Sequence, residues 1–387
     1  MSRHTETAAL SWADYRREFP IFETATYLNT CSLAPLARRV AGAVEQFLSL
    51  WHRHGAAAWY GPWWEEIATL RGRIARAIGA APEEVALFPN VTGALLAAAS
   101  ALDVRARPRV VLSALEFPTT RYLWQTTAGV EHVVLGSAEE TTVPLEAYEA
   151  AVDERTALVV GSHVSFTSGM IRDIAALSRV AHACGALSLV DAYQSVGQLP
   201  LHVRAAGVDF LVGGTLKWLL GGPGMAFLYV RRELIPRLHP EAVGWFAHRD
   251  QFAFASAFDY AEDARRFEGG TPSVAAVYAA SAGLAMVLEI GIDRLRARQL
   301  ELVADLVARA QEAGLRPRVP ADLSRHAGIV TIPRADPPKV VAGLREAGVI
   351  VDSRPGIVRI SPFFFNVPDD HRRAVEALLA LERRGVT

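Results

Sequence analysis

The sequence of 387 residues contains little lysine, little cysteine and no long apolar run. Among its 40 basic residues only Lys217 and Lys339 are lysines. Cys31 and Cys184 are far apart, which argues against a disulfide scaffold or a cysteine-rich metal site. No run of about 18 uncharged apolar residues is present, so we expect no membrane-spanning segment. The net charge of −1 shows no excess of basic residues of the kind that binds nucleic acid.

The composition is that of a globular protein, with 51% hydrophobic and 21% charged residues. The chain is long enough for two domains, each with its own core. Its first twenty residues carry charged side chains throughout and lack the apolar core of a signal peptide. We therefore expect a cytoplasmic protein that binds neither membranes nor nucleic acid.

Short apolar runs alternate with helical patterns through residues 85–230, which predicts an α/β fold with a doubly wound, mostly parallel sheet. We expect this sheet to form a large domain over residues 35–285. Residues 286–387 have the pattern of a smaller α+β C-terminal domain, and residues 1–34 are expected to pack with it. A long helical stretch over residues 274–313 is expected to join the two domains.

Five side chains fall at or just past the ends of predicted strands, at the edge where doubly wound sheets bind their ligands. These residues are Thr92, Phe117, His163, Asp191 and Lys217. The segment from Asn90 to Gly93 also turns from a strand into a helix, whose free N–H groups suit a phosphate. The alternative is that these residues form an ordinary helix N-cap.

The chemistry of Lys217 and Asp191 indicates a cofactor. Lys217 lies between an apolar run and a glycine-rich turn, and a buried ammonium is costly unless it is paired or neutralised. Unlike arginine, lysine can lose its proton and form a Schiff base. An acid on a neighbouring strand would suit pyridoxal phosphate (PLP), because it keeps the pyridine nitrogen protonated while the lysine holds the aldehyde. A structural acid and a lysine extending to solvent are the alternative.

Several motifs resemble those of the class V aminotransferase superfamily, whose members are PLP enzymes of the aspartate-aminotransferase fold type. These motifs are Ser162-His-Val-Ser, Val190-Asp-Ala-Tyr-Gln-Ser-Val-Gly, Asp209-Phe and Lys217-Trp-Leu. Others are more similar to the kynureninase branch, namely Glu116-Phe-Pro-Thr, Lys217-Trp-Leu-Leu-Gly-Gly-Pro-Gly, Gly244-Trp-Phe-Ala-His, Gly270-Thr-Pro-Ser and Val358-Arg-Ile-Ser-Pro. The resemblance covers roughly residues 25–380 and implies the PLP-dependent transferase fold.

The resemblance implies roles for the residues around the cofactor ring. Lys217 would form the internal aldimine and later move protons at the substrate α-carbon. Asp191 would pair with the pyridinium nitrogen, and Gln194 would lie near the ring hydroxyl. Phe117 would stack on the ring, a contact worth about 1 kcal/mol, although a core position is the alternative.

The resemblance also implies residues for the phosphate and the substrate. Thr92 and the Gly93 backbone would contact the phosphate, while Trp245 and Thr271 would reach the phosphate of the other subunit's site. Such shared active sites imply a homodimer. Arg359 would clamp the substrate α-carboxylate with its bidentate fork, although a surface arginine is the alternative. Further substrate contacts are expected from Asn29 and Ser32.

The reaction is less closely defined, because three positions differ from kynureninases. Leu216 replaces a tyrosine, Thr120 an acid and Gln194 a histidine. A desulfurase would need a cysteine in the C-terminal part, and none lies beyond Cys184. We expect an α-amino acid to react through an external aldimine and a quinonoid, followed by kynureninase-like cleavage at the β-carbon. The alternatives are transamination of a small amino or keto acid, epimerisation, C–S lysis, and PLP binding without turnover. No metal is expected.

Overall fold

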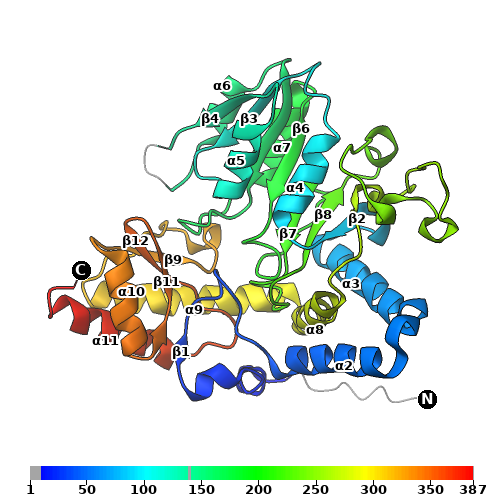
Figure 1. Ribbon diagram of the computed structural model, residues 1–387. Coiled ribbons are helices and arrows are strands. Elements are labelled where there is room, and N and C mark those ends of the chain that lie inside the picture. Colours follow the sequence, from blue (N-terminus) through cyan, green and yellow to red (C-terminus); the bar gives the residue numbers. More distant parts are fainter. Residues whose placement is uncertain (1–9, 138–140, 387) are drawn as a thin grey trace, which may run out of the picture.

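The computed structural model describes residues 10–137 and 141–386 of the chain. A large unit is built on a seven-stranded sheet, and a smaller unit contains a three-stranded sheet (Figure 1). The predicted α/β fold, with a mostly parallel large sheet and a smaller α+β unit, is confirmed. The first nine residues of the expected N-terminal segment lie outside the described residues.

The large sheet follows the predicted alternation closely. In chain order its strands are β2 (Val85–Phe88), β3 (Arg109–Ser113), β4 (Glu131–Leu135), β5 (Thr156–Ser162), β6 (Leu187–Asp191), β7 (Phe210–Gly214) and β8 (Ala226–Val230). Across the sheet they lie in the order β2-β8-β7-β6-β5-β3-β4. All neighbours from β7 to β4 are parallel, and β8 runs antiparallel to both β2 and β7. The central strands are buried on both faces, which explains their continuous apolar sequences.

Helices cover both faces of this sheet. The helices of the large unit are α2 (Arg38–His54), α3 (Pro62–Ile78), α4 (Val91–Ser100), α5 (Pro118–Thr126), α6 (Leu145–Ala151), α7 (Ile174–Ala183) and α8 (Val274–Ile290). Of these, α3, α4, α6 and α7 contact strands of the sheet, whereas α2 packs against α8. Successive side chains of a strand point to opposite faces. In β3, Val110 and Leu112 therefore pack in the core that includes α4, while Val111 packs in the core that includes α6 and α7.

The smaller unit is formed mainly by the C-terminal part of the chain. Its elements are α9 (Ile292–Glu312), β9 (Val330–Pro333), α10 (Pro337–Glu346), β10 (Val349–Ile350), β11 (Asp352–Arg354), β12 (Ile357–Ile360) and α11 (Pro368–Glu382). Strands β11, β12 and β9 form an antiparallel sheet, and β1 (Thr26–Tyr27) pairs in parallel with β10. Helix α1 (Trp12–Arg16) contacts the same unit, because Arg16 pairs with Asp370 at 2.7 Å. The N-terminal segment therefore lies against the smaller unit (Figure 1).

Short 3₁₀ segments complete the secondary structure. They span Pro20–Glu23, Gly55–Tyr60, Pro82–Glu84, Ile235–Arg237, Trp245–Ala247, Gln251–Ala253, Ala264–Phe267 and Leu323–Arg325. Strands β10 and β11 were not predicted from the sequence, since two and three residues are too few to show a strand period.

The helical stretch predicted over residues 274–313 is two helices rather than one. Helices α8 and α9 meet at an angle of 81° at Gly291, which adopts a φ of 88° that glycine accommodates without strain. The expected domain boundary near residue 285 falls inside α8. No single helix in the described ranges is long and apolar enough to cross a membrane, and α8 with α9 meets that test only as a bent pair, by length and composition.

Candidate active site

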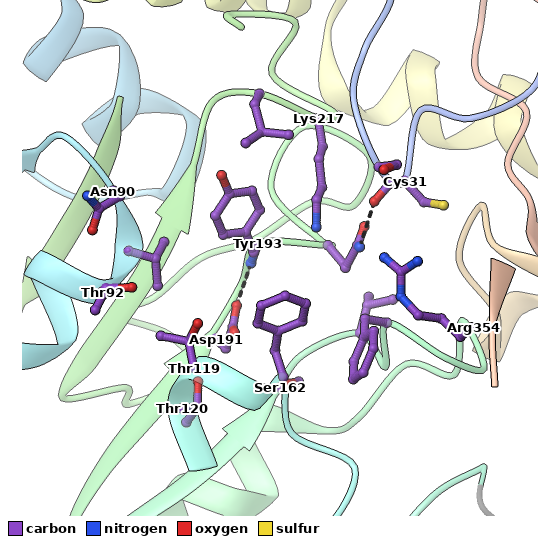
Figure 2. Close-up of a pocket in the computed structure, with 17 residues that line it drawn as sticks. Cys31, Asn90, Thr92, Thr119, Thr120, Ser162, Asp191, Tyr193, Lys217 and Arg354 are labelled. Carbon is purple, nitrogen blue, oxygen red and sulfur yellow. Dashed lines mark hydrogen bonds between the residues drawn. The ribbon is translucent and has the colours of Figure 1, made fainter. Parts of the chain in front are cut away.

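A cavity of about 370 Å³ lies at the carboxyl edge of the large sheet, a size typical of small-molecule sites (Figure 2). The large sheet, the N-terminal segment and the smaller unit all contribute to its wall. Of the predicted site residues, six line it: Ser32, Thr92, Phe117, Asp191, Gln194 and Lys217. Five do not: Asn29, Gly93, Trp245, Thr271 and Arg359.

Lys217 follows β7, and its side chain points into the cavity (Figure 2). Its Nζ atom lies 4.5 Å from the centroid of the Tyr193 ring. Burial lowers the pKa of Lys217 from its usual 10.5 to about 8, although the nearby Cys31 and Asp191 favour the charged form. More of this amine is therefore neutral and nucleophilic near neutral pH than in an ordinary lysine, although the charged form still predominates at pH 7.

The turn that carries Lys217 rests directly on the backbone of α8. Leu220 in this turn adopts a left-handed φ of 60°, which is uncommon for a residue with a side chain. A Cβ atom on Gly221 would lie 2.5 Å from the Ala280 Cα atom, and a Cβ on Gly283 would lie 2.5 Å from the Leu220 backbone. Glycine on both sides of the contact therefore allows the close approach that fixes the lysine.

Asp191 is the last residue of β6 and lines the same cavity. Its Oδ1 atom accepts a hydrogen bond of 2.9 Å from the Tyr193 N–H, drawn in Figure 2. Burial raises the pKa of Asp191, whereas this hydrogen bond and the nearby Lys217 lower it. A buried carboxylate with so few partners is stabilised by a cationic group placed in the cavity.

Gln194 has a second role that its position in the sequence does not show. Its Nε2 atom donates to the Cys31 carbonyl at 2.9 Å, and its Oε1 atom accepts from the Trp218 indole at 2.8 Å. The amide therefore ties the N-terminal segment to the turn that carries the lysine. One Nε2 hydrogen of Gln194 remains free to bind another partner. The contact of Gln194 with the ring hydroxyl of the cofactor stays a prediction.

The N-terminus of α4 forms another wall of the cavity. Asn90 caps the helix by accepting the Gly93 N–H at 2.9 Å, so the N-cap alternative and the phosphate hypothesis are compatible. Val91 and Thr92 line the cavity, and their N–H groups precede the first helical hydrogen bond. These amides, rather than the Gly93 N–H, are available to an anion.

Phe117 is not a core residue, because 40% of its surface is exposed. It lines the cavity and meets Phe166 edge-to-face with the ring centroids 5.2 Å apart. An aromatic face at this position can stack on a planar ring. Its predicted stacking on the cofactor ring stays a prediction.

Trp245 and Thr271 lie away from the cavity at exposed positions. The Trp245 indole donates to the Gln251 carbonyl. Their contribution to another subunit's site, and the homodimer itself, stay predictions. Asn29 also lies outside the cavity wall and forms a backbone bridge with Ser361.

Arg359 is fully buried and already paired in the structure. Its Nε and Nη2 atoms bind the two carboxylate oxygens of Asp352 at 2.7 and 2.6 Å, and Nη1 donates to the Phe166 carbonyl at 2.6 Å. The bidentate fork predicted to clamp a substrate therefore faces Asp352. Arg354, which is not among the predicted site residues, lines the cavity instead (Figure 2).

We expect the Arg359→Met variant to lose about 3 kcal/mol of unfolding free energy, because the partly buried Asp352 carboxylate loses both Arg359 hydrogen bonds and keeps, among the described residues, only the Arg354 guanidinium at 3.0 Å. Denaturant unfolding would measure the loss. The double variant Asp352→Leu/Arg359→Met should recover most of it. An unchanged unfolding midpoint together with a raised KM would instead identify Arg359 as the substrate clamp.

Other residues near the cavity were missed or placed differently. Tyr193 and Cys31 line it, and the signal for Tyr193 was its position two residues after the strand-end acid. Glu116 is buried behind the wall, where it accepts a hydrogen bond from Ser162 and where burial raises its pKa to about 7. His163, expected at this edge, is buried outside the wall, and burial lowers its pKa to about 4.

The donor set in the cavity fits pyridoxal phosphate. Lys217 would hold the aldehyde, Asp191 the ring nitrogen, Phe117 one ring face and the first turn of α4 the phosphate. The incompletely paired Asp191 carboxylate is the observation that supports this assignment, since a protonated pyridine nitrogen would satisfy it. In the described ranges, no group of three His, Cys, Asp or Glu residues could hold a metal.

Comparisons with known proteins agree with this chemistry. The family profile described as "Aminotransferase class-V" matches residues 26–366. "Uncharacterized aminotransferase YcbU" of Bacillus subtilis (strain 168) is 35% identical over 370 residues, which is 95% of this chain and 97% of that protein. Kynureninase of Pseudomonas fluorescens is 30% identical over 370 residues, covering 90% and 87% of the two chains.

A solved structure supports the same fold. It is a C-DES variant with glycine covalently linked to its PLP cofactor, and it superposes with a TM-score of 0.86 at 20% identity. The superposition covers 94% of this chain and 98% of that chain.

Proposed function

This chain belongs to the class-V aminotransferase family, and from that premise we propose that it transfers the amino group of a small α-amino acid to a keto acid. It is an enzyme that depends on pyridoxal 5′-phosphate. The observation that carries the proposal is the buried Lys217 amine in one cavity with the Asp191 carboxylate. When bound, the cofactor withdraws electrons from the substrate and stabilises the carbanion left by loss of the α-proton.

Side chains of the cavity would hold and move the proton that leaves the substrate α-carbon. Lys217 Nζ, with its pKa lowered to about 8 by burial, can both accept and return a proton near neutral pH. Asp191 keeps a positive charge on the ring side of the cavity. Phe117 and Tyr193 line the cavity with aromatic surface, which limits the access of water to the proton being moved.

Transamination is favoured because it needs one base that moves a proton between two neighbouring carbon atoms. Cleavage at the β-carbon requires a further acid or base beside the substrate side chain. The cavity residue next to the lysine is Leu216, which can supply neither. The relative that is 35% identical is named an aminotransferase, which supports the same choice.

Kynureninase-like cleavage at the β-carbon, the expectation from sequence, is the second candidate. It is favoured by the kynureninase relative at 30% identity and by the phenol of Tyr193, which lines the cavity. A phenol can act as an acid or a base toward a substrate side chain.

A product analysis separates the two reactions. The cofactor-loaded enzyme is incubated with candidate amino acids without a keto acid, and the cofactor is then extracted and identified. Transamination leaves stoichiometric pyridoxamine phosphate, which a keto acid converts back to the aldehyde. An aldehyde that persists while a shortened amino acid accumulates would reject transamination in favour of β-cleavage.

The lowered pKa of Lys217 predicts how cofactor binding depends on pH. Only the neutral amine attacks an aldehyde, so the rate of reconstitution of the cofactor-free enzyme should rise with pH and level off above about pH 8. Stopped-flow absorbance after mixing with PLP measures this rate. A rate that still increases toward pH 10 would show that burial does not lower the pKa.

A further inference from the structure

A second cavity, of about 760 Å³, adjoins the cavity that contains Lys217. The two cavities share three wall residues, Phe117, Phe166 and Arg354. A molecule held beside Lys217 would therefore lie next to the second space, with these residues at the border. The second cavity is the larger of the two, which leaves room for a side chain beyond the reacting atoms.

Arginine side chains give the second cavity a positive character. Its wall includes Arg121 of α5, Arg318 of the segment before β9, and Arg354 of β11, the last of which pairs with Asp352 at 3.0 Å. Among the residues that the structure describes, Arg121 and Arg318 form no ion pair, and the Arg121 Nε atom is buried without a hydrogen-bond partner. The carboxyl of Glu116, also in this wall, accepts a hydrogen bond from Ser162.

Thr331 provides an independent sign of a missing polar partner. Its side chain is 1% exposed and lines the second cavity, and its Oγ1 atom has no hydrogen-bond partner in the described structure. Thr331 adjoins Arg318, whose N–H donates to the Thr331 carbonyl at 2.8 Å. Buried hydroxyls are normally paired, so an oxygen of a ligand held by Arg318 would satisfy this one.

Two of the three residues that the cavities share are aromatic. Phe117 and Phe166 stand edge-to-face, and Leu115, Pro355 and Ile357 continue the apolar surface. This arrangement suits a short methylene chain that ends in an anionic group. Arginine is the residue best matched to a terminal carboxylate, because its guanidinium can form two parallel hydrogen bonds.

We propose that the second cavity binds the anionic end of the substrate side chain, so that the enzyme acts on α-amino acids with a distal carboxylate. Arg121 and Arg318, together with Thr331, would hold that carboxylate. The assignment rests on the proposed function, since it requires the α-amino group to reach Lys217. It adds the substrate class, which the family alone does not specify.

The test compares acids with amides of nearly the same size. The cofactor-loaded enzyme is titrated with L-aspartate, L-glutamate and L-2-aminoadipate, and with the side-chain amide of each, while the cofactor absorbance is followed. In at least one pair we expect the acid to bind about tenfold more tightly than its amide, as charge-assisted hydrogen bonds imply. Three lengths are used because the distal carboxylate must reach the arginines from Lys217.

Two substitutions locate the preference. Arg121→Met and Arg318→Met each remove a charge with little change in volume, and each should weaken binding of the preferred acid about tenfold while leaving its amide within about twofold. Arg318 is exposed, so its substitution should not impair folding. Arg316→Met, an exposed position in the same segment outside the cavity wall, is the matched control and should change neither affinity.

The outcomes separate the substrate assignment from the proposed function. Equal affinity for acids and amides, or a preference that survives both substitutions, would overturn the carboxylate site while leaving the amino-acid chemistry intact. If no amino acid changes the absorbance and Lys217 carries no cofactor adduct, the proposed function fails and the substrate assignment fails with it.

Discussion

The Lys217→Ala variant should lose its covalently held cofactor, and its kcat should fall by a factor on the order of 10³ or more. Two functions are lost together, because the same amine anchors the aldehyde and moves the substrate proton. No other lysine can substitute, since Lys339 lies at an exposed position on α10. The turn itself should keep its fold, because its close contact with α8 is made by Leu220 and Gly221.

The scarcity of lysine makes the measurement unambiguous. Borohydride reduction followed by peptide mass spectrometry can place a cofactor adduct at Lys217 or Lys339, the two lysine positions in the sequence. We expect the adduct at Lys217 in the parent enzyme and none in the variant. Lys339→Ala is the matched control and should retain full turnover. An adduct at Lys339, or turnover that survives the loss of Lys217, would contradict the assignment of the lysine.

The Asp191→Asn variant should fold normally, but its kcat should fall by about 10²- to 10³-fold. Asparagine keeps the Oδ1 acceptor for the Tyr193 N–H and the volume of the side chain. What it removes is the negative charge, which holds the proton on the ring nitrogen and thereby stabilises the carbanion. Steady-state kinetics and the absorbance spectrum of the bound cofactor measure the effect.

A cofactor analogue separates this electrostatic role from a structural one. The N-methyl analogue of PLP carries a permanent ring charge, so it does not need a carboxylate to keep a proton. Reconstituting Asp191→Asn with it should recover part of the lost rate. A loss that the analogue does not reduce, accompanied by a lower thermal unfolding temperature, would indicate that Asp191 mainly supports the fold of the strand end.

The placement of Lys217 and Asp191 in one cavity could be predicted because it follows from local patterns. Apolar runs alternating with helices specify a mostly parallel sheet, and the carboxyl ends of parallel strands meet at one edge. Asp191 ends β6 and Lys217 follows β7, and these two strands are neighbours. Their approach therefore depends on strand order alone. Residues along one sheet edge can be predicted to lie close together even when the packing of their side chains is unknown.

Residues whose partners are distant in the chain could not be placed in the same way. Gln194 hydrogen-bonds to Cys31, 163 residues away, and Arg359 donates to the Phe166 carbonyl, 193 residues away. The partner of Arg359 in its own hairpin, Asp352, lies in a strand of three residues that has no recognisable period. Packing between the two units decides which polar group forms a hydrogen bond with a buried side chain. A local sequence pattern does not indicate this partner.

Local patterns in the sequence are sufficient to specify the sheet, the class of cofactor chemistry and the edge at which the lysine and the acid meet. Each of these depends on the period of apolar residues or on the chemistry of single side chains. The positions of three arginines emerge only from the packed fold: Arg354 rather than Arg359 faces the cavity, and Arg121 and Arg318 line a second one. A cavity is the space left between separately specified elements, so its wall is fixed only when those elements pack.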